Sequence, residues 1–292
     1  MLPYLNPSKF SYRKIRDGFF YGVFVFSTLI GVIGLLLLLV DVFIDGFPWL
    51  TMGFITNYGS RFPEQSGILA PLMGTLWVVG LTALMVIPIG IGTAIYLEEF
   101  AGKNRLTNLI NLNVSNLAGV PSVIYGLLGL TIFVQLLFQG QRAVIAGSLT
   151  MTLLILPIIV IASQEAIRAV PSGYRDAAFA MGATRWQVVK TVVLPLAIPS
   201  MMSGIILALS RAIGESAPML VISGLIFITF VPATPMDRFT VLPLQIYTWA
   251  AQPQHEFRGI AAAGIILLLL TLIFMNSIAI YIRNRTQKRS DQ

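Results

Sequence analysis

The sequence predicts an all-α integral membrane protein with six transmembrane helices and both termini in the cytoplasm. Hydrophobic residues make up 56% of the 292-residue chain and charged residues only 11%, about half the share of roughly 25% that soluble proteins carry. The mean hydropathy is +0.83. These charges are too few to cover a water-facing surface, and a disordered chain would be poor in apolar residues. A lipid bilayer is therefore the solvent that fits this composition.

Six apolar stretches are long enough to cross a bilayer, which takes about 20 residues. Only the fifth contains two prolines, Pro195 and Pro199. The shorter stretch 216–230 is typical of an interfacial or re-entrant helix. The first stretch ends without a small-residue cleavage pattern, so we expect a span rather than a cleaved signal peptide. The predicted spans are 19–44, 72–97, 117–138, 143–162, 192–213 and 260–282.

The basic residues predict the orientation of the spans. Both tails and the loops 98–108 and 163–191 are rich in Lys and Arg, and the positive-inside rule places such segments in the cytoplasm. Two cytoplasmic tails require an even number of spans, in agreement with six. Because this distribution explains the net charge of +7, we expect no nucleic-acid partner. The basic residues outside these segments are Arg61, Arg142, Arg238 and Arg258 in the outer loops and Arg211 within a span.

Several chemistries are excluded by the residues that the chain lacks. It has no cysteine, which excludes disulfides and thiolate sites. Its single histidine, His255, lies in a polar outer loop, so neither a metal site nor a hydrolase site is expected. No G-x-x-x-x-G-K-[ST] phosphate loop occurs. We therefore expect no enzymatic activity and no cofactor in this chain, and any ATP would be hydrolysed by another subunit.

The segment 163–195 is too long for a simple connection between spans. A helix can begin near Tyr174 and end at Gly182, where glycine suits the residue after a helix. Thr184 and Gln187 have the spacing of a capping box at the start of a second helix. The pattern predicts a short helix, a glycine turn and a second helix that continues into the fifth span.

This loop resembles the EAA loop of ABC importer permeases. An acidic residue precedes two alanines, a glycine follows six positions after the acid, and an aliphatic residue ten positions further on precedes Leu-Pro. Two conservative departures occur, aspartate for the usual glutamate and valine for isoleucine. The resemblance implies the smaller, type I permease fold, with the short helix docked in a cleft of an ATP-hydrolysing subunit; an ordinary amphipathic helix is the alternative. The residues concerned are Asp176, Ala177, Ala178, Gly182, Val192, Leu194 and Pro195.

Further segments resemble the permeases of phosphate-specific ABC importers. Residues 116–126 (NLAGVPSVIYG) and 211–218 (RAIGESAP) are similar to signatures of both permeases of that family. Residues 96–100 (YLEEF) and 242–247 (LPLQIY) are more similar to the PstA-type subunit than to its PstC-type partner. The resemblance covers about 68–283.

The resemblance implies a phosphate importer of the bacterial inner membrane. Its other parts would be a PstC-type permease, a dimer of ATP-binding subunits that hold ATP and Mg, and a periplasmic or surface phosphate-binding protein. The implied organisation is a cytoplasmic tail (1–18), a first span with an outer loop (19–67), a permease core (68–283) that contains the coupling loop 163–195, and a second cytoplasmic tail (284–292).

Arg211 is the candidate phosphate contact. An arginine inside a bilayer costs about 2.5–3.5 kcal/mol, so it faces a polar cavity or a partner. Its guanidinium suits an oxyanion, and Glu215 at i+4 lies on the same face and partly offsets the charge, which favours release. A structural ion pair and snorkelling to the headgroups remain alternatives. Ser122 and Tyr125 are candidates for packing or solute contact, and Ser216 for capping a helix or lining the exit.

Three expectations remain open. Glu98 and Glu99 face solvent by default or pair with Lys103 or Arg105. Molybdate or sulfate would suit the same charge chemistry as phosphate. An ion-coupled secondary transporter would show an internal repeat and midplane ionisable groups, whereas this sequence has no repeat and one charged pair.

Overall fold

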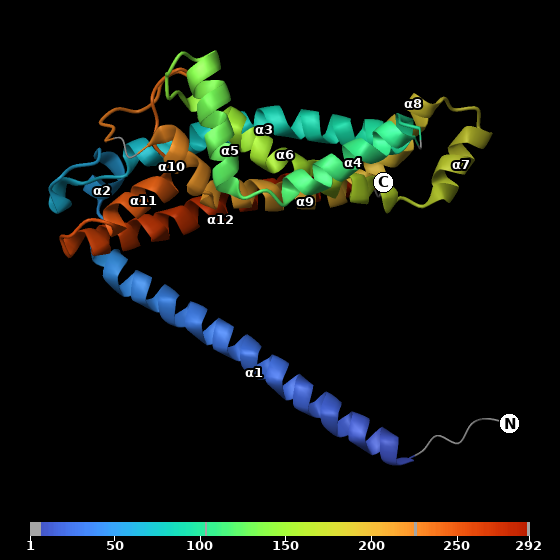
Figure 1. Ribbon diagram of the computed structural model, residues 1–292, viewed down its shortest axis with the longest axis horizontal. Helices are drawn as coiled ribbons and strands as arrows, with labels where there is room; N and C mark the ends of the chain where they lie inside the picture. The colour runs from blue at the N-terminus through green and yellow to red at the C-terminus, as the bar shows by residue number, and fades with distance from the viewer. Residues whose placement is uncertain (1–6, 103, 225–226, 291–292) are drawn as a thin grey trace.

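The computed structural model describes residues 7–102, 104–224 and 227–290, and this part of the chain is helical with no β-strand. Five helices are long and apolar enough to cross a membrane, or six if one bent helix pair counts as a single span. The predicted all-α membrane fold is thus confirmed. Figure 1 shows four of these helices side by side along the long axis. They are α3 (Leu69–Ile95), α6 (Val144–Arg168), α9 (Leu194–Gly214) and α12 (Glu256–Ser290).

The bent pair corrects the third predicted span. Helix α4 (Arg105–Ala118) and helix α5 (Ser122–Leu128), which continues as a π-helix over Gly129–Leu137, meet at 106°. The predicted span 117–138 is therefore wrong at its start, because its first residues form a corner. Pro121 is extended there, with ψ 134°, and a proline that follows a helix cannot continue its hydrogen-bond ladder.

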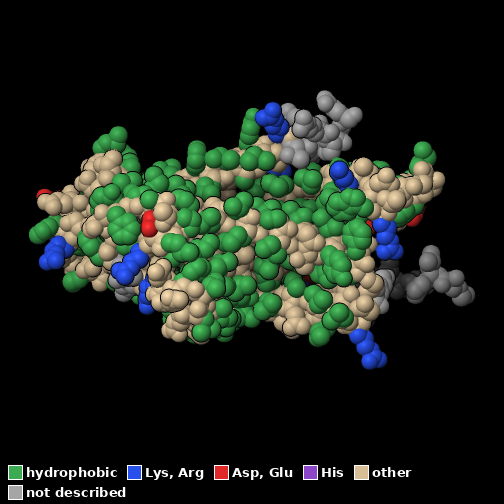
Figure 2. All heavy atoms as spheres, turned by 90° about the horizontal axis from the view of Figure 1, so that it is seen from above, with side chains coloured by type: hydrophobic (Ala, Val, Ile, Leu, Met, Phe, Trp, Pro, Cys, Tyr) green, Lys and Arg blue, Asp and Glu red, His purple; other side chains and the backbone are tan. Residues whose placement is uncertain are grey.

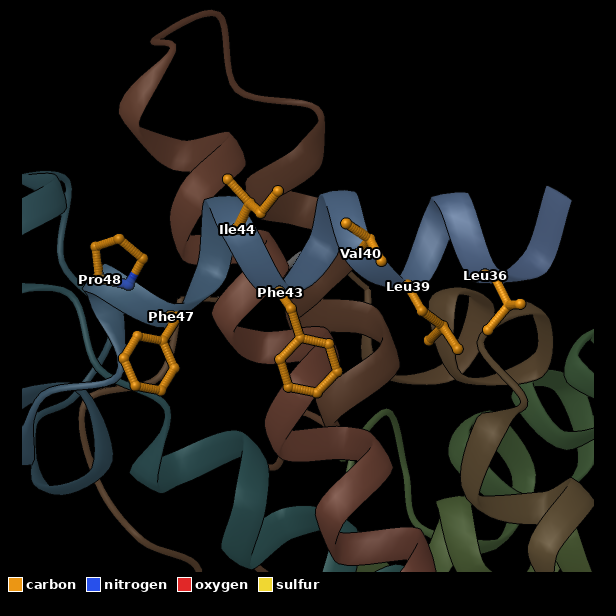
Figure 3. A pocket seen from close by; sticks show the side chains of 7 residues that line it. All are labelled: Leu36, Leu39, Val40, Phe43, Ile44, Phe47 and Pro48. Carbon is orange, nitrogen blue, oxygen red and sulfur yellow. The ribbon is translucent and has the colours of Figure 1, made fainter. Parts of the chain in front are cut away.

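Helix α1 (Pro7–Gly46) stands away from the bundle (Figure 1). It meets α12 at one end, where Gly46 approaches the α12 backbone so closely that a Cβ would lie 2.7 Å from the Ala262 carbonyl carbon. None of the residues in the most apolar part of α1 is buried within the chain. Figure 3 shows apolar side chains of α1, such as Phe43, and of the turn that follows it, such as Phe47, around a hollow of about 510 Å³. Its apolar surface is therefore available to lipid or to a neighbouring subunit.

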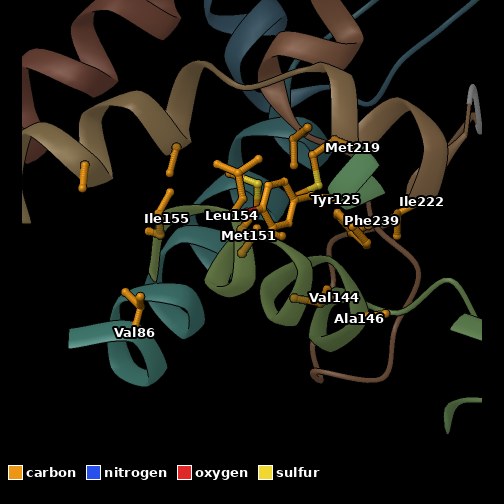
Figure 4. Packing of buried hydrophobic residues seen from close by; sticks show 14 of the residues in the cluster. Val86, Tyr125, Val144, Ala146, Met151, Leu154, Ile155, Met219, Ile222 and Phe239 are labelled. Atoms are coloured by element: carbon orange, nitrogen blue, oxygen red, sulfur yellow. The ribbon is translucent and has the colours of Figure 1, made fainter. Parts of the chain in front are cut away.

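The core lies where α3, α6 and α9 meet the short helices of one end (Figure 4). Small residues allow close approach between helices, as is common in membrane proteins. A Cβ at Gly90 of α3 would lie 2.6 Å from Ile159 of α6. The short helices at this end are α2 (Met52–Thr56), α10 (Ala217–Ser223) and α11 (Leu242–Ala250).

Helix α10 confirms a short helix in the stretch 216–230, of which 225–226 lie outside the described residues. Figure 2 shows hydrophobic side chains over the middle of one face and Lys and Arg side chains mainly toward its two ends. This distribution matches a bilayer around the middle of the bundle.

Candidate functional site

The predicted coupling loop occupies the end of the bundle opposite α2 and α10 (Figure 1). Helix α7 (Ser172–Ala180) is followed by Gly182 at φ +82°, where glycine is favoured. Helix α8 (Arg185–Val188) then continues through a π-helical turn into α9. The capping box is confirmed, since the Thr184 hydroxyl accepts from the Gln187 backbone N–H and the Gln187 side-chain oxygen accepts from the Thr184 N–H at 2.7 Å.

The residues of the EAA-like pattern face in different directions. Asp176, Ala177 and Gly182 are exposed, whereas Ala178 is half-buried and packs against the apolar cluster between the ends of α3, α6 and α9. Large apolar side chains are exposed around them, and Met181 is 88% exposed. A clustered apolar surface of this kind is typical of a protein-binding site. Its other large members are Tyr174, Phe179 and Trp186.

A second set of charged residues ties this loop to the spans. The Arg175 guanidinium donates to Glu99, with 2.8 Å between Nη2 and Oε1, and to the backbone carbonyls of Ile167 and Val170 at the end of α6. The side chains of Arg175 and Glu99 are only 19% and 15% exposed. The first turn of α7 is therefore fixed to the ends of both α3 and α6.

Glu98 joins a neighbouring network. It pairs with Arg168, with 2.6 Å between Nη2 and Oε1, and accepts from the Gln164 amide, which also donates to Asn111 of α4. The expectation that Glu98 and Glu99 face solvent is wrong, because both carboxylates are mostly buried against α6 and α7. Of the partners expected for them, Lys103 lies outside the described residues.

Sequence reasoning missed Arg175, Arg168 and Gln164. Their partners lie about 70 positions away, and no local spacing indicates such pairs. The available signal was the glutamate pair itself, since two adjacent carboxylates at the end of an apolar span require partners when buried. Arg175, which directly precedes Asp176, was a second signal, because an arginine in this loop is a natural partner for such a carboxylate.

The Arg211–Glu215 pair lies at the other end of the bundle, where α9 ends. The Arg211 Nε lies 3.2 Å from Glu215 Oε1, which confirms that the two residues share a face. The Glu215 side chain is 17% exposed and lines a narrow crevice with Thr75 and Met219, whereas the Arg211 side chain is 55% exposed. The guanidinium therefore extends outward from a carboxylate that is turned toward the core.

Tyr125 serves the fold at the α4–α5 corner. Its hydroxyl donates to the Leu117 carbonyl at 2.8 Å, and its ring lies among Met151, Leu154 and Met219 (Figure 4). This contact links the two arms of the bend, in keeping with the packing alternative.

The remaining two candidate residues, Ser122 and Ser216, lie at the starts of α5 and α10. Ser122 is half-buried in the first turn of α5. Ser216 occupies the N-cap position of α10, but its side chain makes no capping hydrogen bond there. Its carbonyl accepts from the Leu220 N–H at 2.9 Å, so the backbone of Ser216 rather than its hydroxyl begins the helix.

The two signature segments 116–126 and 211–218 come together in space. A Cβ at Gly126 would lie 2.8 Å from Pro218 Cα, so α5 and α10 pack with almost no space between their backbones. Residues 86–288 match the family of binding-protein-dependent transport system inner membrane components. The chain belongs to this family. It is a multi-pass inner-membrane permease subunit of an ABC importer.

The names of similar proteins agree with this family assignment. A probable ABC transporter permease protein, YqgI of Bacillus subtilis, is 31% identical over 95% of this chain and 98% of the relative. The phosphate transport system permease protein PstA 1 of Mycobacterium tuberculosis is 33% identical over 88% of this chain and 86% of the relative.

Solved structures share the fold. A chain in the crystal structure of a bacterial alginate ABC transporter, in complex with an alginate pentasaccharide-bound periplasmic protein, has a TM-score of 0.71 and 16% identity. The match covers 94% of this permease and 96% of that chain.

Proposed function

We propose that this permease is the PstA-type subunit of an ATP-driven importer of inorganic phosphate. The observation that carries the proposal is the Arg211–Glu215 pair. Only the Arg211 Nε is engaged by Glu215, and the two terminal nitrogens make no hydrogen bond to any residue that the structure describes. A guanidinium in this state presents a fork that matches two oxygens of a tetrahedral oxyanion.

The Glu215 carboxylate beside Arg211 favours a site that releases the anion over a site that binds it tightly. Glu215 cancels part of the positive charge, which lowers the affinity of the site and favours release of the anion. The similarity to permeases named for phosphate transport supports phosphate as the anion.

The coupling loop supports a partner that hydrolyses ATP. Asp176, Ala177 and the exposed apolar side chains around Met181 form a surface at the end of the bundle that carries both basic tails in the predicted topology. In the mechanism proposed here, a dimer of ATPase subunits binds ATP and Mg and moves the two coupling helices. The spans of this chain and of a homologous PstC-type permease then alternate between outward and inward access. A phosphate-loaded binding protein delivers the anion at the outer face.

The proposal is tested by purifying the complex that accompanies this tagged permease and placing it in lipid discs. ATP hydrolysis is measured with the cognate binding protein and phosphate, sulfate or molybdate in turn. Stimulation by phosphate alone is the expected result. Stimulation only by sulfate or molybdate would keep the ABC importer and overturn the substrate, and a permease that brings down no ATPase would contradict the coupling role of the loop.

A further inference from the structure

Two adjacent glutamates at the end of α3 hold two different elements. The chain leaves α3 through a π-helical turn, Tyr96–Phe100. Consecutive side chains of a helix point in different directions around its axis, and here Glu98 reaches Arg168 of α6 while Glu99 reaches Arg175 of α7. The first pair connects two spans, and the second connects a span to the coupling helix.

The Arg175–Glu99 pair, called the clamp, joins three elements through one side chain. Arg175 Nε and Nη2 both donate to Glu99 Oε1, at 3.1 and 2.8 Å. Its Nη1 donates to the Val170 carbonyl at 2.6 Å, and Nη2 also reaches the Ile167 carbonyl at 2.9 Å. These carbonyls lie at and just beyond the C-terminal end of α6, where the negative end of the helix dipole favours a cation. One guanidinium thus binds α3 and α6 to α7 simultaneously.

Helix α7 is otherwise attached to the spans by the short link 169–171 after α6 and by partial packing against the start of the fifth span. None of its residues is fully buried. Ala178 packs on the apolar cluster beneath it, and the chain continues through Gly182 into α8. The α8 segment also contacts the end of α3, since Val188 is buried in the same cluster as Ala94 and the rings of Phe100 and Trp186 lie 6.4 Å apart. A movement imposed on the exposed face of α7 therefore reaches α3 most directly through the clamp, whereas it reaches α6 through both the clamp and the short chain link 169–171.

We infer that Arg175 is a positioning residue that makes the coupling helix move together with α3 and α6. The inference deepens the proposed function, because it assumes that an ATPase subunit displaces α7. Both side chains of the clamp are less than a fifth exposed, so the pair is poorly screened by solvent and the loss of either partner leaves the other charge in an apolar setting. Lysine cannot replace the guanidinium fully, because a single ammonium lacks the fork that reaches both the carboxylate and the two carbonyls.

The first experiment measures how many ATP molecules are hydrolysed for each anion imported into proteoliposomes. Arg175→Gln and Glu99→Gln are compared with the parental complex and with Arg168→Gln, a matched control that removes the neighbouring arginine but leaves α7 attached. We expect the two clamp variants to retain basal ATP hydrolysis while the number of ATP molecules per imported anion rises by about 5- to 150-fold, the usual range of coupling between sites. Arg168→Gln keeps the parental ratio, and Arg175→Lys falls between the parent and Arg175→Gln.

A purely structural role for Arg175 gives a different result. Loss of folded complex would lower transport and ATP hydrolysis in equal proportion and leave the ratio unchanged, which would overturn the inference. The ratio is measured with whichever anion stimulates the parental complex. A wrong substrate and a wrong clamp are therefore distinguished.

A second measurement needs neither substrate nor ATPase. Backbone amide exchange is followed in the purified permease in lipid discs, for the parent, Arg175→Gln and Arg168→Gln. We expect the amides of 172–180 to exchange at least about tenfold faster in Arg175→Gln alone, because local opening follows the loss of the contacts that hold a segment. Unchanged exchange of this helix in Arg175→Gln would show that the clamp does not hold it.

Discussion

Gly126 and Pro218 are in contact across the interface of α5 and α10, and this contact joins the two segments that carry the likeness to phosphate permeases. A Cβ on Gly126 would lie 2.8 Å from Pro218 Cα and 3.1 Å from its carbonyl oxygen. Both obstacles are backbone atoms, so no side chain can rotate away. The position of α10, and with it the end of α9 that carries Arg211, depends on a residue without a side chain.

Gly126→Ala is therefore expected to destabilise the permease. Overpacking of this kind costs about 1–3 kcal/mol, which thermal unfolding in detergent should detect as a lower midpoint. The matched control is Gly80→Ala on α3, where nothing lies within 4 Å of the added Cβ and alanine favours the helix. An unchanged midpoint in Gly126→Ala would show that α5 and α10 separate easily.

Arg211→Gln is expected to lower phosphate uptake without affecting assembly. A hydrogen bond to a charged group contributes about 1.5–3 kcal/mol, so uptake in proteoliposomes should fall by about 10- to 150-fold, with a smaller loss in Arg211→Lys. Arg258→Gln removes an exposed arginine in the first turn of α12 and serves as the control. Uptake at the parental rate by a normally assembled Arg211→Gln complex would exclude the pathway role.

Ala177 and Ala178 are expected to respond differently to a large side chain. Ala177 is exposed, so Ala177→Trp should leave the thermal stability of the isolated permease unchanged while the amount of co-purified ATPase falls about tenfold or more. Ala178 packs against the permease's own cluster, so Ala178→Trp should lower the stability of the permease itself by about 1–3 kcal/mol. The docking surface proposed for α7 is wrong if Ala177→Trp retains the parental amount of ATPase.

Asp237 is expected to make the outer loop sensitive to acid. Its carboxylate accepts backbone hydrogen bonds at 2.8 Å from Thr234 and from Ala233, and these bonds lower the pKa of Asp237. A carboxyl group whose folded pKa is lowered stabilises the fold above its unfolded pKa and loses this effect as the pH falls through the folded value. The loop should therefore open below about pH 4.

Amide exchange of residues 233–238 provides the measurement for this loop. The parent should be more protected than Asp237→Asn near about pH 6, and the difference should vanish well below about pH 4. Equal protection in both proteins at the higher pH would rule out a role for the carboxylate in closing the loop.

Much of the architecture follows from local patterns in the sequence. The length and hydropathy of the apolar stretches predict the long helices, because the bilayer requires that each backbone group be satisfied within a helix. Gly182 and the Thr184–Gln187 capping box predict the turn and the second helix of the coupling loop, because each depends on residues within one helical turn. The Arg211–Glu215 pair belongs to the same class, since its two members are four positions apart.

The tertiary structure decided what depends on distant partners. The start of the third span was placed wrongly because residues 117–138 are apolar on both sides of Pro121, and hydropathy does not indicate the direction of a helix. Glu98 and Glu99 find their partners on α6 and α7 rather than on the nearby α4, because the packing of α6 against α3 brings distant arginines to the same end of the bundle. The sequence by itself therefore determined the five long spans, the coupling loop and the charged pair on α9. Only the packing of the helices decided which carboxylate meets which arginine, because an ion pair between elements depends on how they lie in space.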